Sequence, residues 1–180
     1  MTAKVLMAST SEVWTELAKG DMGKLKSTVH DQSPYVSILM GELVGPPFAQ
    51  LRRLITFPER HRWVCEAFTA NLLSKCDTTV RDTRPINHLA AEQLLIDLQT
   101  MRPLLTSLHL ADPAYKEHVE RMLTGVERTY KILLHDAKDA DAFVAHYYLM
   151  SDGDGREEVF KRVLELKGIV RDGMTAVAGT

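Results

Sequence analysis

The sequence predicts an all-α protein, a helical bundle of about seven to eight helices. Apolar residues recur at helical spacing along almost the whole chain, and no alternating segment is bounded by hairpin signals. Glycine and proline fall at the ends of the periodic segments. The 180 residues, 45% of them hydrophobic, are enough for one domain with a substantial core. A single helical bundle is therefore expected.

Each expected helix follows a stretch of helical periodicity and ends at a residue that interrupts it. In chain order, the expected helices span Ala3–Val29, Pro34–Val44, Pro47–Ile55, Pro58–Lys75, Asn87–His109, Asp112–His135, Asp139–Met150 and Glu157–Leu166.

Prolines set the boundaries of the early helices. Asp31, Gln32 and Ser33 precede Pro34 and are suited to cap the helix that begins there. Gly45, Pro46 and Pro47 are expected to break the chain into two helices, since proline lacks a backbone N–H.

The helix that begins at Pro58 carries both cysteines, Cys65 and Cys76. Eleven residues of helix separate them by roughly 16 Å, too far for a disulfide bond. Because Leu72 and either Phe68 or Thr69 share their face, we expect a buried stripe with two reduced thiols.

The two central helices have the clearest patterns. In the first, Pro103 predicts a kink near Gln99. In the second, Asp112 is placed to cap the first turn and Pro113 fits the first helical position. Core stripes are expected at Leu94, Leu98, Met101, Leu105 and Leu108, and at Tyr115, Val119, Met122, Val126, Tyr130 and Leu133.

The last two helices are divided by the turn at residues 151–155, and Gly168 is placed just past the final helix, where positive φ is needed. We expect Tyr115, Phe143, Tyr147 and Phe160 to pack in the core.

Charge and hydropathy exclude several classes of protein. A net charge of −2 gives no overall positive field for nucleic acid, and no apolar run approaches the length needed to cross a bilayer. The apolar stretch after Lys4 is too short for a secretory signal, so a cytoplasmic protein is expected.

The sequence contains no motif of a known catalytic, cofactor or metal site. His88 and Glu92 are one helical turn apart and form the best nucleus for a metal site, but a helix-start histidine beside a polar glutamate is the interpretation that the sequence favours. We therefore predict no enzyme activity, no cofactor and no metal. The most basic stretch contains Arg52, Arg53, Arg60 and Arg62, which form either solvated helix faces or a patch for anionic lipids.

Several short strings, taken in order, resemble a known family. They are Asp31–Val36, Ala91–Leu95 with Asp97, then Tyr115, Val119, Glu127 and Lys131, and finally Phe143, Val144, Tyr147, Phe160 and Leu166–Gly168 with Arg171. The set resembles the C-terminal region of vacuolar protein sorting-associated protein fifty-three, a subunit of the Golgi-associated retrograde protein tethering complex.

The resemblance covers roughly residues 29–171 and implies stacked helical-rod bundles, as in the tethering complexes containing helical rods. Residues 1–28 form a loosely matched N-terminal helix, and 29–180 form the C-terminal bundle within a single domain. The resemblance also implies a piece of a longer subunit, whose N-terminal region, absent here, would bind the other subunits. Residues 75–86 match poorly, so no function is transferred to them.

Three groups of polar residues at matched positions are candidates for a partner-binding surface. Glu127 and Lys131 could equally be a simple surface pair, and Glu92, Gln93 and Asp97 could equally form a hydrogen-bond network between helices. Lys167 and Arg171 flank Gly168, where positive charge is favourable at a helix C-terminus on dipole grounds alone.

The resemblance and the lack of catalytic motifs lead to one hypothesis. The chain is expected to be a non-catalytic docking module that recognises a vesicle-borne protein or membrane feature during retrograde transport from endosomes. It would lie peripherally at the membranes of the trans-Golgi network and endosomes. The alternative is direct binding of anionic lipids through the basic stretch.

Overall fold

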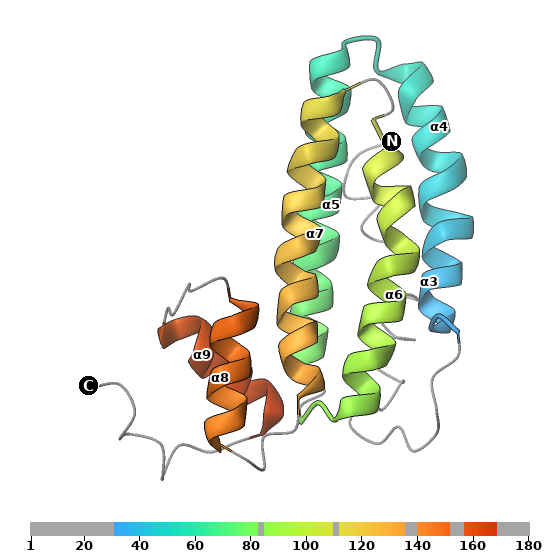
Figure 1. Ribbon diagram of the computed structural model, residues 1–180. Coiled ribbons are helices and arrows are strands. Elements are labelled where there is room, and N and C mark those ends of the chain that lie inside the picture. Colours follow the sequence, from blue (N-terminus) through green and yellow to red (C-terminus); the bar gives the residue numbers. More distant parts are fainter. Residues whose placement is uncertain (1–30, 83–84, 110–111, 136–139, 152–156, 169–180) are drawn as a thin grey trace.

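The computed structural model describes residues 31–82, 85–109, 112–135, 140–151 and 157–168. Within these ranges the chain forms seven α-helices and one π-helical stretch and contains no strand, so the all-α prediction is confirmed. Four helical rods lie side by side, and a shorter helix pair packs beside one end of them (Figure 1). The helix expected at residues 3–29 and the residues 1–28 lie outside the described ranges.

The first rod differs from its prediction. It runs as α3 (Pro34–Ile38), a π-helical stretch (Leu39–Val44) and α4 (Gly45–Leu54), one continuous helical path (Figure 1). The expected break at Gly45, Pro46 and Pro47 is therefore wrong. The two prolines remove two backbone donors, and the wider turns of the π-helix directly before them let the rod continue without those hydrogen bonds.

The second rod, α5 (Pro58–Asp82), continues past its expected end at Lys75. The added turns carry two buried residues, Cys76 and Val80, so packing rather than propensity extends the helix. Both cysteines are buried and free, as predicted, and Phe68, Thr69 and Leu72 are buried on the same face.

The central pair, α6 (His88–Ser107) and α7 (Pro113–Leu134), form the most extensive helix contact in the described ranges. Asp112 caps α7 as predicted: its Oδ1 accepts hydrogen bonds from the N–H groups of Ala114, at 2.9 Å, and Tyr115, at 3.2 Å. α6 runs through Pro103 without interruption, and a bend near Gln99 stays a prediction.

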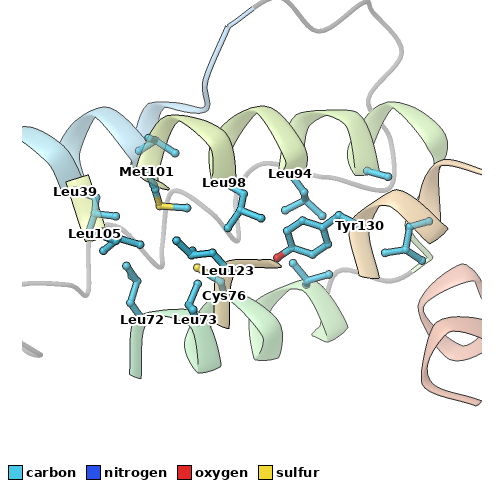
Figure 2. Packing of buried hydrophobic residues seen from close by; sticks show 14 of the residues in the cluster. Leu39, Leu72, Leu73, Cys76, Leu94, Leu98, Met101, Leu105, Leu123 and Tyr130 are labelled. Carbon is cyan, nitrogen blue, oxygen red and sulfur yellow. The ribbon is translucent and has the colours of Figure 1, made fainter. Parts of the chain in front are cut away.

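The core lies between α5, α6, α7 and the first rod. Figure 2 shows Leu94, Leu98 and Met101 in a row along α6, facing Leu123 and Tyr130 of α7. The predicted α6 stripe is fully buried, whereas on α7 Met122 and Val126 are only half-buried and Leu123 takes the central place. The stripe on α7 is therefore rotated slightly from its prediction.

The end pair, α8 (Ala140–Met150) and α9 (Glu157–Lys167), packs against α7. Tyr147 and Phe160 meet edge to face, with ring centroids 4.8 Å apart. Tyr115, Phe143 and Tyr147 are almost fully buried, which confirms their predicted packing role, and Phe160 packs half-buried against Phe143 and Tyr147.

The C-terminus of α9 is locked onto the loop between α5 and α6. Gly168 follows the helix with φ of 72°, as predicted, and the N–H of Ile86 donates to the carbonyl of Leu166 at 2.8 Å. A Cβ at Gly168 would lie 2.8 Å from Cβ of Pro85, closer than carbon atoms pack. Glycine is therefore required here for both conformation and space.

Replacing Gly168 with alanine should lower the free energy of unfolding by at least about 1–2 kcal/mol, since an L-residue is strained at positive φ and the methyl group meets Pro85. Gly125→Ala is the matched control, because Gly125 lies inside α7 and a methyl group added there would meet no atom within 4 Å. That variant should gain up to about 1 kcal/mol. Urea denaturation followed by circular dichroism measures both, and equal midpoints for the two variants would contradict the proposed constraint at Gly168.

Candidate functional site

Two of the candidate residues form a buried polar anchor between α6 and the start of α3. Asp97 is completely buried, and its Oδ1 accepts hydrogen bonds from the N–H of Ser33 at 2.7 Å and from Gln93 Nε2 at 2.9 Å. Gln93 Nε2 also donates to the carbonyl of Asp31 at 2.9 Å. Of the two roles considered for Gln93 and Asp97, a network between helices is the one that this geometry fits.

The anchor also corrects the expected cap of α3. Ser33 occupies the N-cap position, but its side chain makes no capping hydrogen bond. Asp31 Oδ1 accepts from the N–H of Gln32 at 2.8 Å instead. A carboxylate from another helix, Asp97, binds the backbone at Ser33. Local capping is therefore the wrong explanation for the residues Asp31–Ser33, because the carboxylate that binds their backbone belongs to Asp97, far away in the sequence.

Burial governs the protonation of the groups around the anchor. Desolvation raises the pKa of Asp97, although hydrogen bonds from Ser33, Gln93 and Tyr35 act in the opposite direction. Burial likewise raises the pKa values of Tyr35 and Tyr130, and it raises the pKa of the Cys76 thiol to about 12. These hydroxyl and thiol groups therefore stay protonated at neutral pH and serve in packing.

A second cluster joins α6 to α7 through charge. Arg102 Nη1 lies 2.5 Å from Glu120 Oε2, and Arg102 Nη2 also pairs with Glu127. Lys131 Nζ lies 2.7 Å from Glu127 Oε1, so the predicted pair on α7 forms. Hydrogen bonding to Lys131, together with the positive charges of Lys131 and Arg102, holds the pKa of Glu127 below its usual value. The glutamate is mostly buried in this cluster, and Lys131 is its exposed member.

The remaining matched candidates are Glu92, Lys167 and Arg171. Glu92 is half-buried on α6, one turn after the exposed His88. Lys167 is the last residue of α9 and is half-buried at the Gly168 junction. Arg171 lies outside the described residues. The structure does not bring the six described candidates into one patch, since the buried anchor and the charged cluster are separate sets of contacts on α6.

The basic stretch is divided by the fold. Arg52 and Arg53 are exposed in the last turn of α4, and Arg60 is exposed in the first turn of α5, with its Cζ 5.0 Å from the centroid of the Phe57 ring. Arg62 differs, because it pairs with Glu66 at 2.8 Å and with Asp112 at 2.9 Å. Its charge is used to tie α5 to the cap of α7.

Several contacts are not visible in the sequence pattern. Arg102 lies within an apolar seam, and Asp77, which pairs with Arg81 at 3.0 Å and with Arg162 of α9, lies in the segment to which no function was transferred. The rings of His61 on α5 and His109, just after α6, also lie tilted against each other, with centroids 5.1 Å apart. Apart from the Asp77–Arg81 pair, each contact joins residues distant in sequence, so no local pattern signals it.

Two negative observations apply only to the described ranges. Within them, no group of three or more His, Cys, Asp or Glu residues could hold a metal ion, and His88 with Glu92 remains a bare pair. Among the described helices, none is long and apolar enough to pass through a bilayer.

Within the described ranges the fold is an all-helical domain held together by buried and charged contacts between helices, and comparison with known proteins shows which family it is similar to. Residues 92–169 match the family model described as "Vacuolar protein sorting-associated protein 53 C-terminus". The chain is also similar to the vacuolar protein sorting-associated protein 53 homolog of Caenorhabditis elegans, with 26% identity over 160 residues and 83% of this chain covered. These matches support a vacuolar protein sorting-associated protein 53 C-terminal domain and confirm the resemblance.

The matched region is only part of a longer relative. The chain spans 20% of the length of the worm protein. No solved structure matches. The family model covers α6 to α9 from Glu92 onward, which includes the anchor residues on α6, the charged cluster and the Gly168 junction.

Removing the Asp97 carboxylate should destabilise the domain, because the N–H of Ser33 and the amide of Gln93 lose a buried partner. We expect Asp97→Ala to lose about 1–3 kcal/mol of unfolding free energy at neutral pH. Asp97→Asn keeps one acceptor oxygen without the charge and should lose much less. Chemical denaturation of both variants measures this, and equal losses would contradict the proposed role of the acceptor.

The same variants test the raised pKa of Asp97. Because the folded pKa lies above the ordinary value of 3.8, the wild-type stability from this group is present at low pH and is lost as pH rises through the folded pKa. As pH rises from the ordinary pKa of Asp97 through its folded pKa, the wild-type protein should therefore lose unfolding free energy relative to Asp97→Asn, which has no charge to bury. A difference independent of pH would contradict the assignment.

Arg102 should matter more than Lys131, because it is the more buried cation and bridges two glutamates. We expect Arg102→Met to cost about 1–2 kcal/mol and Lys131→Met no more than about 0.5 kcal/mol. The folded pKa of Glu127 is lowered, so its contribution is present above the ordinary pKa and is lost as pH falls through the folded value. Urea denaturation at neutral and acidic pH should show the Arg102→Met penalty shrinking in acid.

Proposed function

We propose that the domain is a non-catalytic docking module of a vesicle-tethering complex, acting in retrograde transport from endosomes to the trans-Golgi network. The observation that carries the proposal is the family match over residues 92–169, which includes every described residue of the partner-binding candidates. The worm relative, whose name places it in vacuolar protein sorting, supports the same role.

The cations at the α8–α9 end are the best docking groups among those candidates. Lys131 is exposed in the last turn of α7, and Lys167 ends α9, whose last turn contacts the loop between α5 and α6. Both therefore lie at the end of the bundle that carries the short helix pair (Figure 1). Gln93 and Asp97 hold α6 to the start of α3 and serve as structural support.

The partner proposed for this end is an acidic protein segment, borne by the vesicle or by a sibling subunit. Cations at a rim set the rate and specificity of encounter with an oppositely charged partner. The other subunits of the complex would be bound mainly through regions outside this chain, and the domain would lie peripherally at trans-Golgi network and endosome membranes.

Charge reversal at this end tests the proposal. Lys131→Glu, Lys167→Glu and Arg171→Glu, combined in the full-length subunit, should slow recycling of a retrograde cargo receptor severalfold, because an acidic partner would be repelled. The measurement is receptor return to the trans-Golgi network in cells depleted of the endogenous subunit. Lys75→Glu, an exposed cation on α5 outside the matched range, is the control.

The thermal unfolding of the triple variant must be checked, since Lys131 also pairs with Glu127. Normal recycling by a folded triple variant would exclude this end of the bundle as the docking surface. Impaired recycling by the Lys75→Glu control as well would show an unspecific charge effect and would equally contradict the proposal.

A further inference from the structure

Exposed apolar side chains gather at one end of the bundle. Among the described residues, five large hydrophobic side chains are highly exposed, and three of them lie between residues 54 and 63: Leu54 at 70%, Phe57 at 60% and Trp63 at 67%. Leu54 ends α4, Phe57 lies in the loop and Trp63 lies in the second turn of α5. Figure 1 shows this loop closing the end of the bundle opposite α8 and α9.

Cations surround these apolar groups. Arg52, Arg53 and Arg60 are all exposed, and Glu59 is the exposed acidic residue beside them. Glu66 on α5 and Asp112 at the cap of α7 are paired with Arg62. Glu117 is exposed in the second turn of α7, where the exposed Lys116 precedes it in the sequence. We call Arg52, Arg53, Leu54, Phe57, Arg60 and Trp63 the basic apolar tip.

Intramolecular stability does not explain the tip. Arg52 and Arg53 suit the negative end of the α4 dipole, and Arg60 lies over the Phe57 ring. Neither effect requires Leu54, Phe57 and Trp63 to face solvent, and large apolar groups left exposed gain no burial free energy on folding. The exposed apolar groups and the cations around them are therefore suited to bind a partner whose surface is both apolar and anionic.

We infer that the basic apolar tip inserts into the headgroup region of an anionic lipid membrane. This inference rests on the proposed tethering function and names a second contact, at the end of the domain opposite the docking cations. The loop residues would enter the acyl boundary, and the arginines would lie among the anionic headgroups.

The dimensions agree with insertion at an interface. Trp63 follows Pro58 by five residues, which places it about 8 Å from the start of α5 along the helix axis. Interfacial segments bury their apolar groups roughly 5–10 Å into the boundary, and tryptophan concentrates at the level of the headgroups. Phe57 at the loop would then lie deepest and Trp63 at the headgroup level.

The location of the apolar groups favours a membrane over a folded protein partner. Leu54 ends α4, Phe57 lies in the loop at the extremity of the bundle, and both side chains are exposed. The cations come from the two helices on either side of this loop. A terminal apolar loop flanked by cations matches the layered chemistry of an anionic bilayer surface.

Trp63 itself reports on insertion. In the 180-residue chain with Trp14→Phe, Trp63 is the remaining tryptophan. Its fluorescence should shift to the blue on addition of phosphatidylcholine vesicles containing about 30% phosphatidylserine, and should not shift with phosphatidylcholine vesicles alone. High salt should weaken the effect.

Two sets of variants separate the charged and apolar contributions. Arg52→Glu, Arg53→Glu and Arg60→Glu together should weaken partitioning onto the anionic vesicles by at least about tenfold, and Leu54→Ser with Phe57→Ser should weaken it by a similar factor. The matched controls are Lys75→Glu with Arg121→Glu for charge and Leu149→Ser, exposed on α8, for apolar area. Both control sets should partition like the parent chain, and all variants should keep the parent melting temperature because the changed side chains are exposed.

An unshifted Trp63 spectrum with anionic vesicles, or equal losses in the tip and control sets, would overturn the inference. A blue shift that grows with protein concentration without vesicles would also overturn it and assign the tip to self-association. If vesicle binding fails while the charge reversals at Lys131, Lys167 and Arg171 still impair recycling, the docking function stands without the membrane contact.

Discussion

The fold depends on a buried carboxylate that must find hydrogen-bond donors. Asp97 lies in the helix that contacts both α3 and α7, and its Oδ1 accepts from the backbone of the chain entering α3. An unpaired carboxylate at this depth would oppose folding, so the start of the first rod is fixed in both position and register. The rod then covers one side of the core and carries the α4–α5 loop to the far end of the bundle.

Polar contacts elsewhere divide into those that hold helices together and those that remain exposed. Arg62 and Arg102 are neutralised by partners on neighbouring helices, whereas Arg52 and Arg53 remain at the surface. Nearby arginines in one basic stretch therefore have different roles, and only three-dimensional pairing distinguishes them. The near-neutral net charge of the chain hides this separation, because it averages interior ion pairs with exposed cations.

The sequence predicted what local pattern determines. The α6 core stripe, the Asp112 cap and the positive φ of Gly168 follow from residues within a few positions of each other. The continuity of the first rod does not follow from local pattern, because its hydrogen bonding depends on how the neighbouring turns widen before Pro46 and Pro47. In the candidate site, sequence order selected Gln93 and Asp97, but only distant partners, Asp31 and Ser33, reveal what they do.

The π-helical stretch at Leu39–Val44 gives the first rod an unusual tolerance to the loss of one residue. Its six residues turn through about the same angle as five residues of α-helix, because a π-helix holds more residues in each turn. Deleting one residue there would therefore restore ordinary α-helical winding and leave the faces of the following helix nearly unchanged. Phe48 and Leu51 would stay in the core, and Arg52 and Arg53 would emerge on the same side of the domain. A second deletion would rotate everything after it by about 100° and move Phe48 and Leu51 out of the core.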